Sequence, residues 1–157
     1  MVSIRRQVIE TFKSKVMARI GGVIVSHGQL ANELVAAAEA VVGDLSHLTA
    51  VSIGWHDDVE MAREEIKRAI ALVSSGAGVL ILTDMFGGTP TNIAAMFLIE
   101  GEVEIVTGVN LPMVIKLAST TQEMELHELA REVEEQGQRA ICRAGVLLEP
   151  QKAAKDG

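Results

Sequence analysis

The sequence predicts an α/β protein with a doubly wound, mainly parallel four-stranded sheet and helices on both faces of that sheet. Three observations support this prediction. Short apolar runs of strand length alternate along the 157 residues with longer segments of helical spacing. Strand–helix alternation of this kind gives right-handed crossovers and a parallel sheet. The run "GVLILTD" (78–84) is apolar without alternation, as expected for a strand covered on both sides.

The first half of the chain contains two expected strands and two expected helices. The strand Ile20–Ser26 is a β-branched apolar run, and Leu48–Ile53 is the second strand. Segment 30–43 has helical spacing and stops at Gly43; its expected inner side is Leu30, Leu34, Val35, Ala38, Val41 and Val42. Segment 56–76 begins with Asp57 and Glu60 at capping-box spacing; its expected buried stripe is Val59, Ala62, Ile66, Ala69, Ile70 and Val73.

The second half repeats the alternation. After the strand 78–84, Thr89-Pro90 is expected to cap and open a helix that runs through Leu98 and is closed by Gly101. "VEIVTG" (103–108) is the fourth strand, and helices are expected over 111–118 and 121–137. The segment "RAICRAGVLLEP" (139–150) is ambiguous between a strand and irregular structure.

One domain is expected over residues 20–148, followed by a polar tail over 149–157. Residues 1–19 form a basic leader that could be a helix with Val8, Ile9, Phe12 and Val16 inward. Both a functional arm and a start codon placed too early, with translation beginning at Met17, fit this leader. No signal peptide is visible, since no apolar segment follows Arg5 and Arg6.

Composition excludes several classes of protein. A net charge of −7 opposes binding to nucleic acid and to anionic lipid, and an aromatic content of 3% leaves few platforms for base stacking. The apolar runs are too short to span a bilayer. A single cysteine, Cys142, rules out an internal disulfide and favours a cytoplasmic location. Neither metal-ligand spacing nor a nucleotide-binding fingerprint is present, so no metal and no cofactor are expected.

Three loops carry polar or glycine-rich residues at the carboxyl ends of the expected strands. The first strand leads into His27, the third into Asp84 and "MFGGTPTN" (85–92), and the fourth into "TGVNLPM" (107–113). Carboxyl ends of parallel strands share one edge of the sheet, so these groups are expected to meet there. Each alone has a structural explanation, such as a polar strand end or a helix cap. Their joint placement favours a functional site.

A histidine and an aspartate at this edge suit nucleophilic chemistry by imidazole. If Asp84 accepts a hydrogen bond from the Nδ1–H of His27, Nε2 is left as the nucleophile. The glycine-rich turn, in which Gly88 is expected to have a positive φ, leads into a helix N-terminus that can bind an anion. The expected phosphoryl-binding residues are Gly28, Gly87, Gly88 and Thr89.

The other candidate residues are weaker. His56 shares the same edge and could be peripheral to the site, although surface exposure explains it better. His47 lies in a polar turn and His127 on a helix face. Ser26 is not expected to be a hydrolase nucleophile, because the chain has no G-x-S-x-G elbow.

Three blocks together resemble the mannose-class IIA domain of the bacterial phosphoenolpyruvate-dependent sugar phosphotransferase system. They are "GGVIVSHGQLANELVAAAEAVVG", "GVLILTDMFGGTPTNIA" and "VEIVTGVNLPM", in order from about Ile20 onward. The resemblance implies a phosphotransferase in which His27 carries a phosphoryl group on Nε2 and Asp84 supports it. The donor would be the histidine phosphocarrier protein and the acceptor a IIB component.

The resemblance also implies a homodimer in which a C-terminal strand crosses to the partner. The apolar tail and the open edges of a four-stranded sheet favour the same assembly. Nothing after Gly145 resembles a linker into a IIB domain, so we expect a stand-alone IIA protein that meets membranes only indirectly, through transporter subunits. The sugar and the cognate IIB component cannot be read from this chain.

Three alternatives remain. A regulatory module whose phosphohistidine controls a partner protein would share the His27 chemistry and differ in its acceptor. The phosphotransfer subunit of dihydroxyacetone kinase has a similar fold and an early histidine, but the "FGGTP" and "GVNLPM" blocks favour the mannose class. A phosphoaspartate receiver needs an acidic pair after its first strand, and "VSHG" has none.

Overall fold

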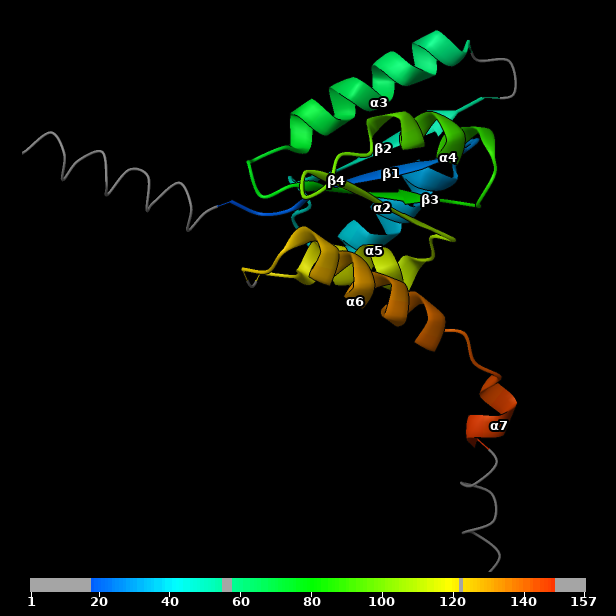
Figure 1. Ribbon diagram of the computed structural model, residues 1–157. Helices are drawn as coiled ribbons and strands as arrows, with labels where there is room; N and C mark the ends of the chain where they lie inside the picture. The colour runs from blue at the N-terminus through cyan, green and yellow to red at the C-terminus, as the bar shows by residue number, and fades with distance from the viewer. Residues whose placement is uncertain (1–17, 55–57, 122, 149–157) are drawn as a thin grey trace, which may run out of the picture.

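The computed structural model describes residues 18–54, 58–121 and 123–148. Within them, four parallel strands form one sheet in the order β2-β1-β3-β4 (Figure 1). The strands are β1 (Gly21–His27), β2 (Leu48–Ile53), β3 (Val79–Thr83) and β4 (Val103–Thr107). The predicted fold class and all four strand positions are confirmed. The expected roles of residues 1–17, His56 and the tail 149–157 lie outside the described residues.

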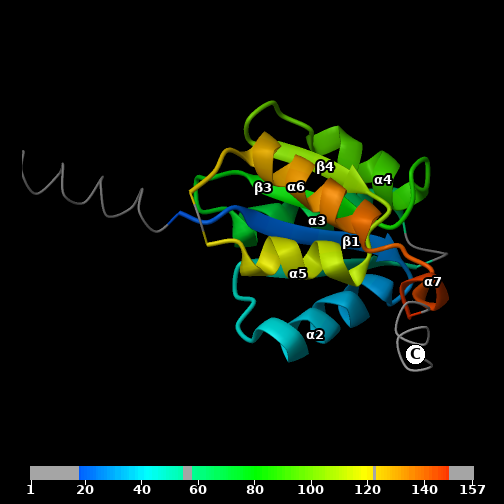
Figure 2. The same ribbon diagram turned by 90° about the horizontal axis from the view of Figure 1, so that it is seen from below.

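Helices cover both faces of the sheet, as predicted. One face carries α3 (Val59–Val73) and α4 (Thr89–Ala94), which continues into a short 3₁₀ helix (Ala95–Phe97). The other face carries α2 (Leu30–Val42), α5 (Leu111–Ser119) and α6 (Leu126–Arg139), seen in front of the strands in Figure 2. The sheet is therefore the middle of three layers.

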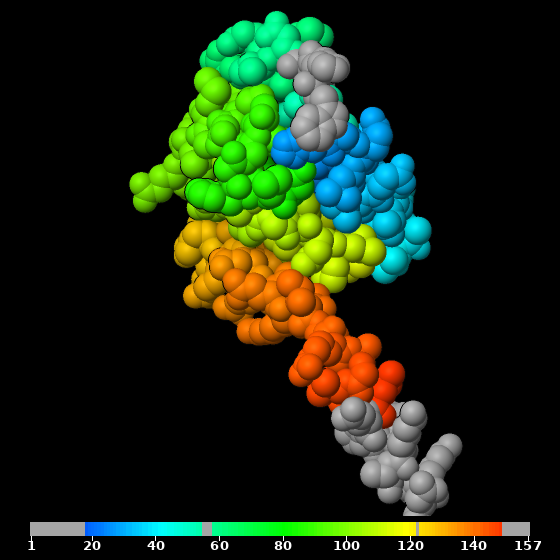
Figure 3. All heavy atoms as spheres, turned by 90° about the vertical axis from the view of Figure 1, so that its right-hand side faces the viewer, coloured from blue at the N-terminus to red at the C-terminus, as the bar shows by residue number. Residues whose placement is uncertain are grey.

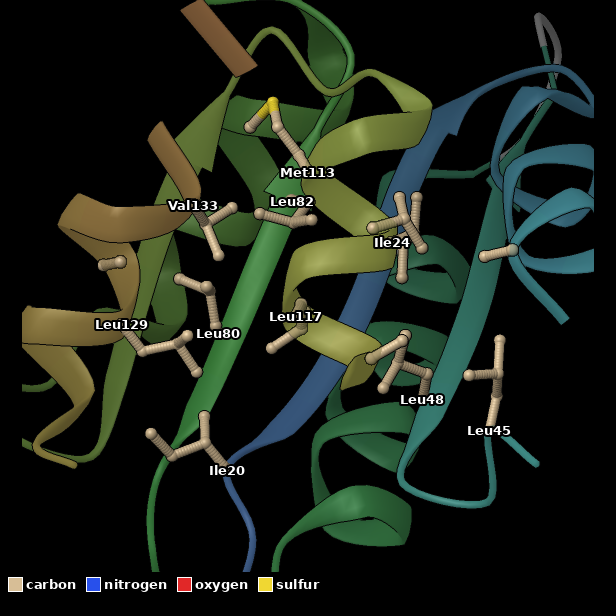
Figure 4. Packing of buried hydrophobic residues seen from close by; sticks show 14 of the residues in the cluster. Ile20, Ile24, Leu45, Leu48, Leu80, Leu82, Met113, Leu117, Leu129 and Val133 are labelled. Carbon is tan, nitrogen blue, oxygen red and sulfur yellow. The ribbon is translucent and has the colours of Figure 1, made fainter. Parts of the chain in front are cut away.

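Alternate residues of the central strands point into two separate cores. Ile24 of β1 and Leu82 of β3 pack under α2, α5 and α6, together with Leu117 and Leu129 (Figure 4). Their neighbours in the sequence, Val23, Val25 and Ile81, point to the opposite face, where they belong to the same cluster as Ile66 of α3 and Ile93 of α4. Burial on both sides explains why β3 shows no alternation of polar and apolar residues.

Arg19 belongs to the folded domain. Its Nη2 donates hydrogen bonds to the carbonyl oxygens of Ala118 (2.9 Å) and Thr120 (3.2 Å), at the C-terminal end of α5. A cation at this end of a helix satisfies terminal carbonyls and interacts favourably with the helix dipole. The part of the expected leader that the structure describes thus contributes a cap to α5.

Several expected helix ends shift by a few residues. The N-cap of α3 is Asp58, whose side chain accepts from the N–H of Glu60 (3.0 Å), so the predicted N-cap at Asp57 is wrong. The N-cap of α4 is Gly88 rather than Thr89, and α4 itself ends at Ala94, well before the predicted end at Leu98. A capping box from Glu125 to Glu128 starts α6 five residues after the predicted start.

Two regions are more exposed than the apolar pattern predicts. Leu30 and Val41 of α2 and Val59 of α3 lie at the surface, whereas Ala31 is buried. The tail is irregular over 141–143, as one of the two expectations had it, but it forms a short helix, α7 (Ala144–Leu148), where neither a strand nor irregular structure is found. Its apolar side chains are exposed, and α7 stands away from the body of the domain (Figure 3).

Candidate functional site

The order of the strands creates a switch point between β1 and β3. From β1 the chain crosses to β2 on one side, and from β3 it crosses to β4 on the other. Ligand sites of open α/β sheets form outside the carboxyl ends of the strands at such a point. His27 is the last residue of β1, and Asp84 directly follows β3. Both candidate residues therefore sit where this architecture places a site.

His27 and Asp84 are in direct contact, as the sequence predicts. Nδ1 of His27 lies 2.8 Å from Oδ2 of Asp84, and the backbone N–H of His27 donates to the same oxygen at 2.9 Å. The other oxygen, Oδ1, accepts from the N–H of Met85 at 2.9 Å. A carboxylate only accepts hydrogen bonds, so Nδ1 carries the proton and Nε2 of the neutral ring carries the lone pair.

The hydrogen bonds around Asp84 keep its carboxyl group ionised. Burial acts to raise the pKa of Asp84, but the backbone N–H of His27 and the His27 ring act to lower it, with a smaller contribution from the N–H of Met85. The net result is a pKa below the usual value for aspartate. The side chain of Asp84 is 13% exposed and that of His27 is 32% exposed, so the imidazole remains accessible beside a largely buried anion.

Gly88 lies against the ring of His27. A Cβ atom at this position would come within 2.8 Å of Cε1 and 3.6 Å of Nε2 of His27, and within 3.1 Å of Cγ of Met85. The φ of Gly88 is −75°, so the expectation of a positive φ is wrong there; the positive φ, 78°, belongs to Gly87. Close approach to the imidazole, rather than backbone conformation, is what requires glycine at position 88.

The amide of Gly28 is already engaged. Its N–H donates to the carbonyl oxygen of Ile53 (2.9 Å), which extends the pairing of β1 with β2 by one residue. The φ of Gly28 is 56°, and a Cβ there would meet open space. This glycine therefore turns the chain out of the sheet immediately after His27.

Ser26 has a role that the sequence analysis missed. It is fully buried, and its Oγ accepts from the N–H of Ala31 (2.7 Å) and donates to the carbonyl oxygen of His27 (3.2 Å). It thus links the end of β1 to the first turn of α2, whose N-cap residue Gln29 makes no side-chain cap. A serine shortly before a helix start is the sequence signal that could have indicated this capping role.

The third loop supports the edge of the sheet. The N–H of Val109 donates to the carbonyl oxygen of Thr83 (2.9 Å). Asn110 caps α5 through Met113 (3.2 Å), and its Nδ2 donates to the carbonyl oxygen of Gly137 in α6 (3.2 Å). The loop is thereby hydrogen-bonded to β3, α5 and α6. A cavity of about 320 Å³ between β4 and α6 includes Asn110 in its lining but neither His27 nor Asp84.

The other described histidines lie away from this edge. His47 precedes β2 at the opposite edge of the sheet, where burial and then the charge of Arg19 lower its pKa. His127 lies on a helix, α6, as predicted, and is exposed there. Among the described histidines, His27 is the one that stands beside a carboxylate at the carboxyl ends of the strands.

Fold and site together define an α/β protein with a carboxylate-supported imidazole at its switch point. The family model described as "PTS system fructose IIA component", of the mannose-type IIA class, matches residues 21–134. The chain therefore belongs to the mannose-class IIA family of the phosphoenolpyruvate-dependent sugar phosphotransferase system.

Individual relatives agree with this family. The chain is 28% identical over 136 residues to the fructose-specific EIIA component of Bacillus subtilis, covering 86% of this chain and 93% of that one. It is 29% identical over 124 residues to the mannose-specific EIIAB component of Escherichia coli K12, covering 76% of this chain but 38% of that one. A mannose/sorbose-specific IIA subunit of Enterococcus faecalis matches in structure with a TM-score of 0.68 and 30% identity, covering 80% and 94% of the two chains.

Membership in this family gives the chain a phosphoryl-transfer role within the sugar phosphotransferase system. IIA components are the phosphotransferase carriers of that system and work with transfer partners such as IIB components. Within the described ranges, no helix combines the length and the apolar character that crossing a bilayer requires.

Proposed function

We propose that His27 accepts a phosphoryl group on Nε2 from the histidine phosphocarrier protein and passes it to a IIB component. The observation that carries this proposal is the 2.8 Å contact between Nδ1 of His27 and Oδ2 of Asp84. It leaves Nε2 as the nitrogen with a lone pair, on the ring edge that faces Gly88. The names of the matched EIIA and EIIAB relatives support the same role.

The transfer step balances without a cofactor. The lone pair on Nε2 attacks the phosphorus atom, and the bond from phosphorus to the donor's nitrogen breaks, with its electron pair returning to the donor imidazole. His27 then carries a phosphoryl group on Nε2, a proton on Nδ1 and a positive ring charge. Asp84 stabilises that charge through its short hydrogen bond. Transfer to the acceptor runs through the same steps in reverse.

Backbone groups at the start of α4 are proposed to hold the phosphoryl oxygens. Gly88 is the N-cap of α4 and Thr89 its first residue, and the first N–H groups of a helix have no acceptor within the helix. Gly87 precedes them in the same turn. Gly28, whose amide already pairs with Ile53, would contribute its tight turn and open surface rather than its N–H.

Apolar side chains beside His27 suit docking of a protein partner. Leu30, Met85 and Phe86 are 46%, 55% and 83% exposed. Leu30 begins α2 just after His27, and the other two lie in the loop between Asp84 and Gly88. Exposed apolar groups around a reactive residue are typical of protein–protein contact sites. The donor protein and the acceptor protein would each contact these exposed apolar side chains, one after the other.

A homodimer is also part of the proposal. β4 is an edge strand of the described sheet, and the tail beyond α6 exposes Ile141, Val146, Leu147 and Leu148. An unpaired sheet edge and exposed apolar side chains are both covered when a second copy binds. The tail would then contact the partner in place of solvent. We expect this dimer to work in the cytoplasm.

Phosphorylation in a reconstituted system tests the proposed function. The protein is incubated with phosphoenolpyruvate, the first enzyme of the system and the histidine phosphocarrier protein, and its intact mass is measured. One phosphoryl adduct that is labile to acid and stable to base is expected. His27→Ala should abolish it, whereas the matched variant His127→Ala, on the exposed face of α6, should retain it. An adduct on the His27→Ala variant would overturn the proposal.

Adding the acceptor to the same experiment distinguishes a phosphoryl carrier from a regulatory module. The phosphorylated protein is mixed with purified IIB component encoded nearby in the genome, and loss of the adduct is followed by mass. Transfer within seconds supports a carrier. An adduct that persists in the presence of every such IIB component would favour the regulatory module over the carrier.

A further inference from the structure

Two threonine hydroxyls are buried directly behind the loop that carries Asp84. Thr83 is the last residue of β3 and is fully buried, and Thr91, in α4, is 8% exposed. Oγ1 of Thr91 lies 2.6 Å from the carbonyl oxygen of Met85 and 2.8 Å from Oγ1 of Thr83. Thr83 lies on the same face of β3 as Ile81, which is buried under α3 and α4, and Thr91 precedes Ile93 of the same core by two residues in α4.

Counting protons fixes the direction of these two hydrogen bonds. The carbonyl oxygen of Met85 can only accept, so the single hydroxyl proton of Thr91 goes to it. The hydroxyl of Thr83 then supplies the proton for the 2.8 Å contact between the two threonines. A chain of donors results: Thr83 donates to Thr91, and Thr91 donates to Met85.

Met85 connects this chain to the carboxylate. Its N–H donates to Oδ1 of Asp84 at 2.9 Å, while its carbonyl is held by Thr91. The peptide groups on both sides of Met85 are thus fixed, one by the carboxylate and one by the buried hydroxyls. The side chain of Met85 also lies near Gly88, which borders the His27 ring. A shift of this residue would move both the carboxylate and the turn at the start of α4.

We propose that the Thr83–Thr91 pair is a positioning device for the His27–Asp84 site. Thr91 holds the Met85 carbonyl, Thr83 orients Thr91, and together they hold Asp84 where it keeps the proton of His27 on Nδ1. The proposal deepens the proposed function and rests on it for its kinetic consequence. Valine has nearly the shape of threonine but lacks the hydroxyl, so a valine at either position removes the hydrogen bonds with little change in side-chain volume.

Nitrogen NMR of the imidazole tests the positioning role without any phosphoryl transfer. In the wild-type protein labelled with ¹⁵N-histidine, the neutral ring of His27 should be in the Nδ1–H tautomer. Thr91→Val should give a mixture of tautomers, and Thr91→Ser, which keeps the hydroxyl, should restore the wild-type spectrum. A Thr91→Val protein with the wild-type tautomer would overturn the proposal. If Thr91→Val does not fold, Thr91→Ala takes its place in the same comparison.

The rate of phosphoryl acceptance gives the second readout. Misplacement of a reacting group by about 1 Å costs up to about a hundredfold in rate, so Thr91→Val is expected to slow acceptance about tenfold at saturating donor, with Thr91→Ser near wild type. Ile66→Val, buried in the same core under α3, is the stability control and should lower the melting temperature without slowing acceptance. Equal slowing by Ile66→Val would mean that loss of stability explains the effect.

The proposed direction of the hydrogen bonds predicts that Thr83→Val and Thr91→Val differ in their effect on the rate. Thr83→Val leaves the bond from Thr91 to Met85 intact, so it should slow acceptance less than Thr91→Val does. Equal effects of the two variants would show that the pair acts by packing and would overturn the proposed direction. If wild-type protein accepts no phosphoryl group, the proposed function fails while the NMR comparison still decides the positioning role. If it accepts one and all threonine variants match it in rate and tautomer, only the positioning role fails.

Discussion

Replacing Gly88 by alanine should damage transfer without damaging the fold. The backbone of Gly88 has φ −75° and ψ 162°, which any residue adopts, so alanine introduces no backbone strain. Gly→Ala at a compatible position stabilises a protein by about 0.4–1 kcal/mol, because the unfolded chain loses freedom. Because contact of the new Cβ with His27 offsets part of this gain, the expected melting temperature is close to that of the wild type.

The loss of activity follows from the contact with His27. The new Cβ would lie 2.8 Å from Cε1 of His27. Carbon atoms pack best at about 3.5–4.0 Å, so the ring must move by about 0.7 Å or rotate away. That movement strains the 2.8 Å hydrogen bond to Asp84 and displaces Nε2 from the start of α4. A displacement of this size is expected to slow phosphoryl acceptance by about ten- to a hundredfold.

The assay compares Gly88→Ala with Gly101→Ala. Gly101 has a φ of 76° and open space around it, far from His27 in the turn before β4. Alanine there costs about 1–2 kcal/mol of backbone strain and lowers the melting temperature by several degrees, with no effect on acceptance. Rapid-quench measurements with the phosphorylated donor and thermal unfolding are made on both variants. A folded Gly88→Ala protein that accepts phosphoryl groups within twofold of the wild-type rate would refute the steric argument.

Three further outcomes are expected. Asp84→Asn should fold normally yet slow transfer by about two to four orders of magnitude, since an amide can favour the wrong tautomer and cannot offset the ring charge; a rate within threefold of wild type would remove Asp84 from the mechanism. Because the folded pKa of Asp84 is depressed, its contribution to stability is present above about pH 4 and is lost as the pH falls through that pKa; urea unfolding should show the difference between wild type and Asp84→Asn shrinking below about pH 4, and a difference constant with pH would contradict this. Light scattering should give a dimer of the 16.8 kDa chain, and deletion of residues 141–157 should give a monomer, whereas a monomeric full-length chain would exclude the dimer.

The meeting of His27 and Asp84 could be predicted because parallel strands place all their carboxyl ends on one edge. Applying this rule requires only that the strands are parallel, and the unbroken apolar sequence of β3 indicates a parallel strand buried on both faces. The adjacency of β1 and β3 was not predictable from the pattern, since strand order depends on which helix covers which face. This adjacency turns two residues on one edge into a hydrogen-bonded pair.

The residues that the sequence did not reveal act through tertiary contacts. Ser26 and Thr91 are ordinary polar residues in the sequence, and their partners, Ala31 and Met85, are identified only when the chain is folded. Asp57 and Asp58 are adjacent carboxylates with equal capping chemistry, so the pattern could not choose between them. The apolar tail fits a strand, a short helix or an interface equally well, because five to nine apolar residues have no decisive period.

The absence of cationic side chains from the turn after β3 suits a group that is bound and then given away. Residues 84–92 contain no lysine or arginine. A hydrogen bond to a charged group contributes about 1.5–3 kcal/mol, which changes an equilibrium constant by about ten- to a hundredfold. A cation in contact with the phosphoryl oxygens would stabilise the phosphorylated protein by that amount and oppose release to the acceptor. Under the proposed function, backbone N–H groups at the start of α4 and the carboxylate of Asp84 would support transfer in both directions. In the proposed mechanism the charge of Asp84 would act on the imidazolium and not on the phosphoryl group, so it would stabilise the phosphorylated ring while leaving the transferred group weakly held.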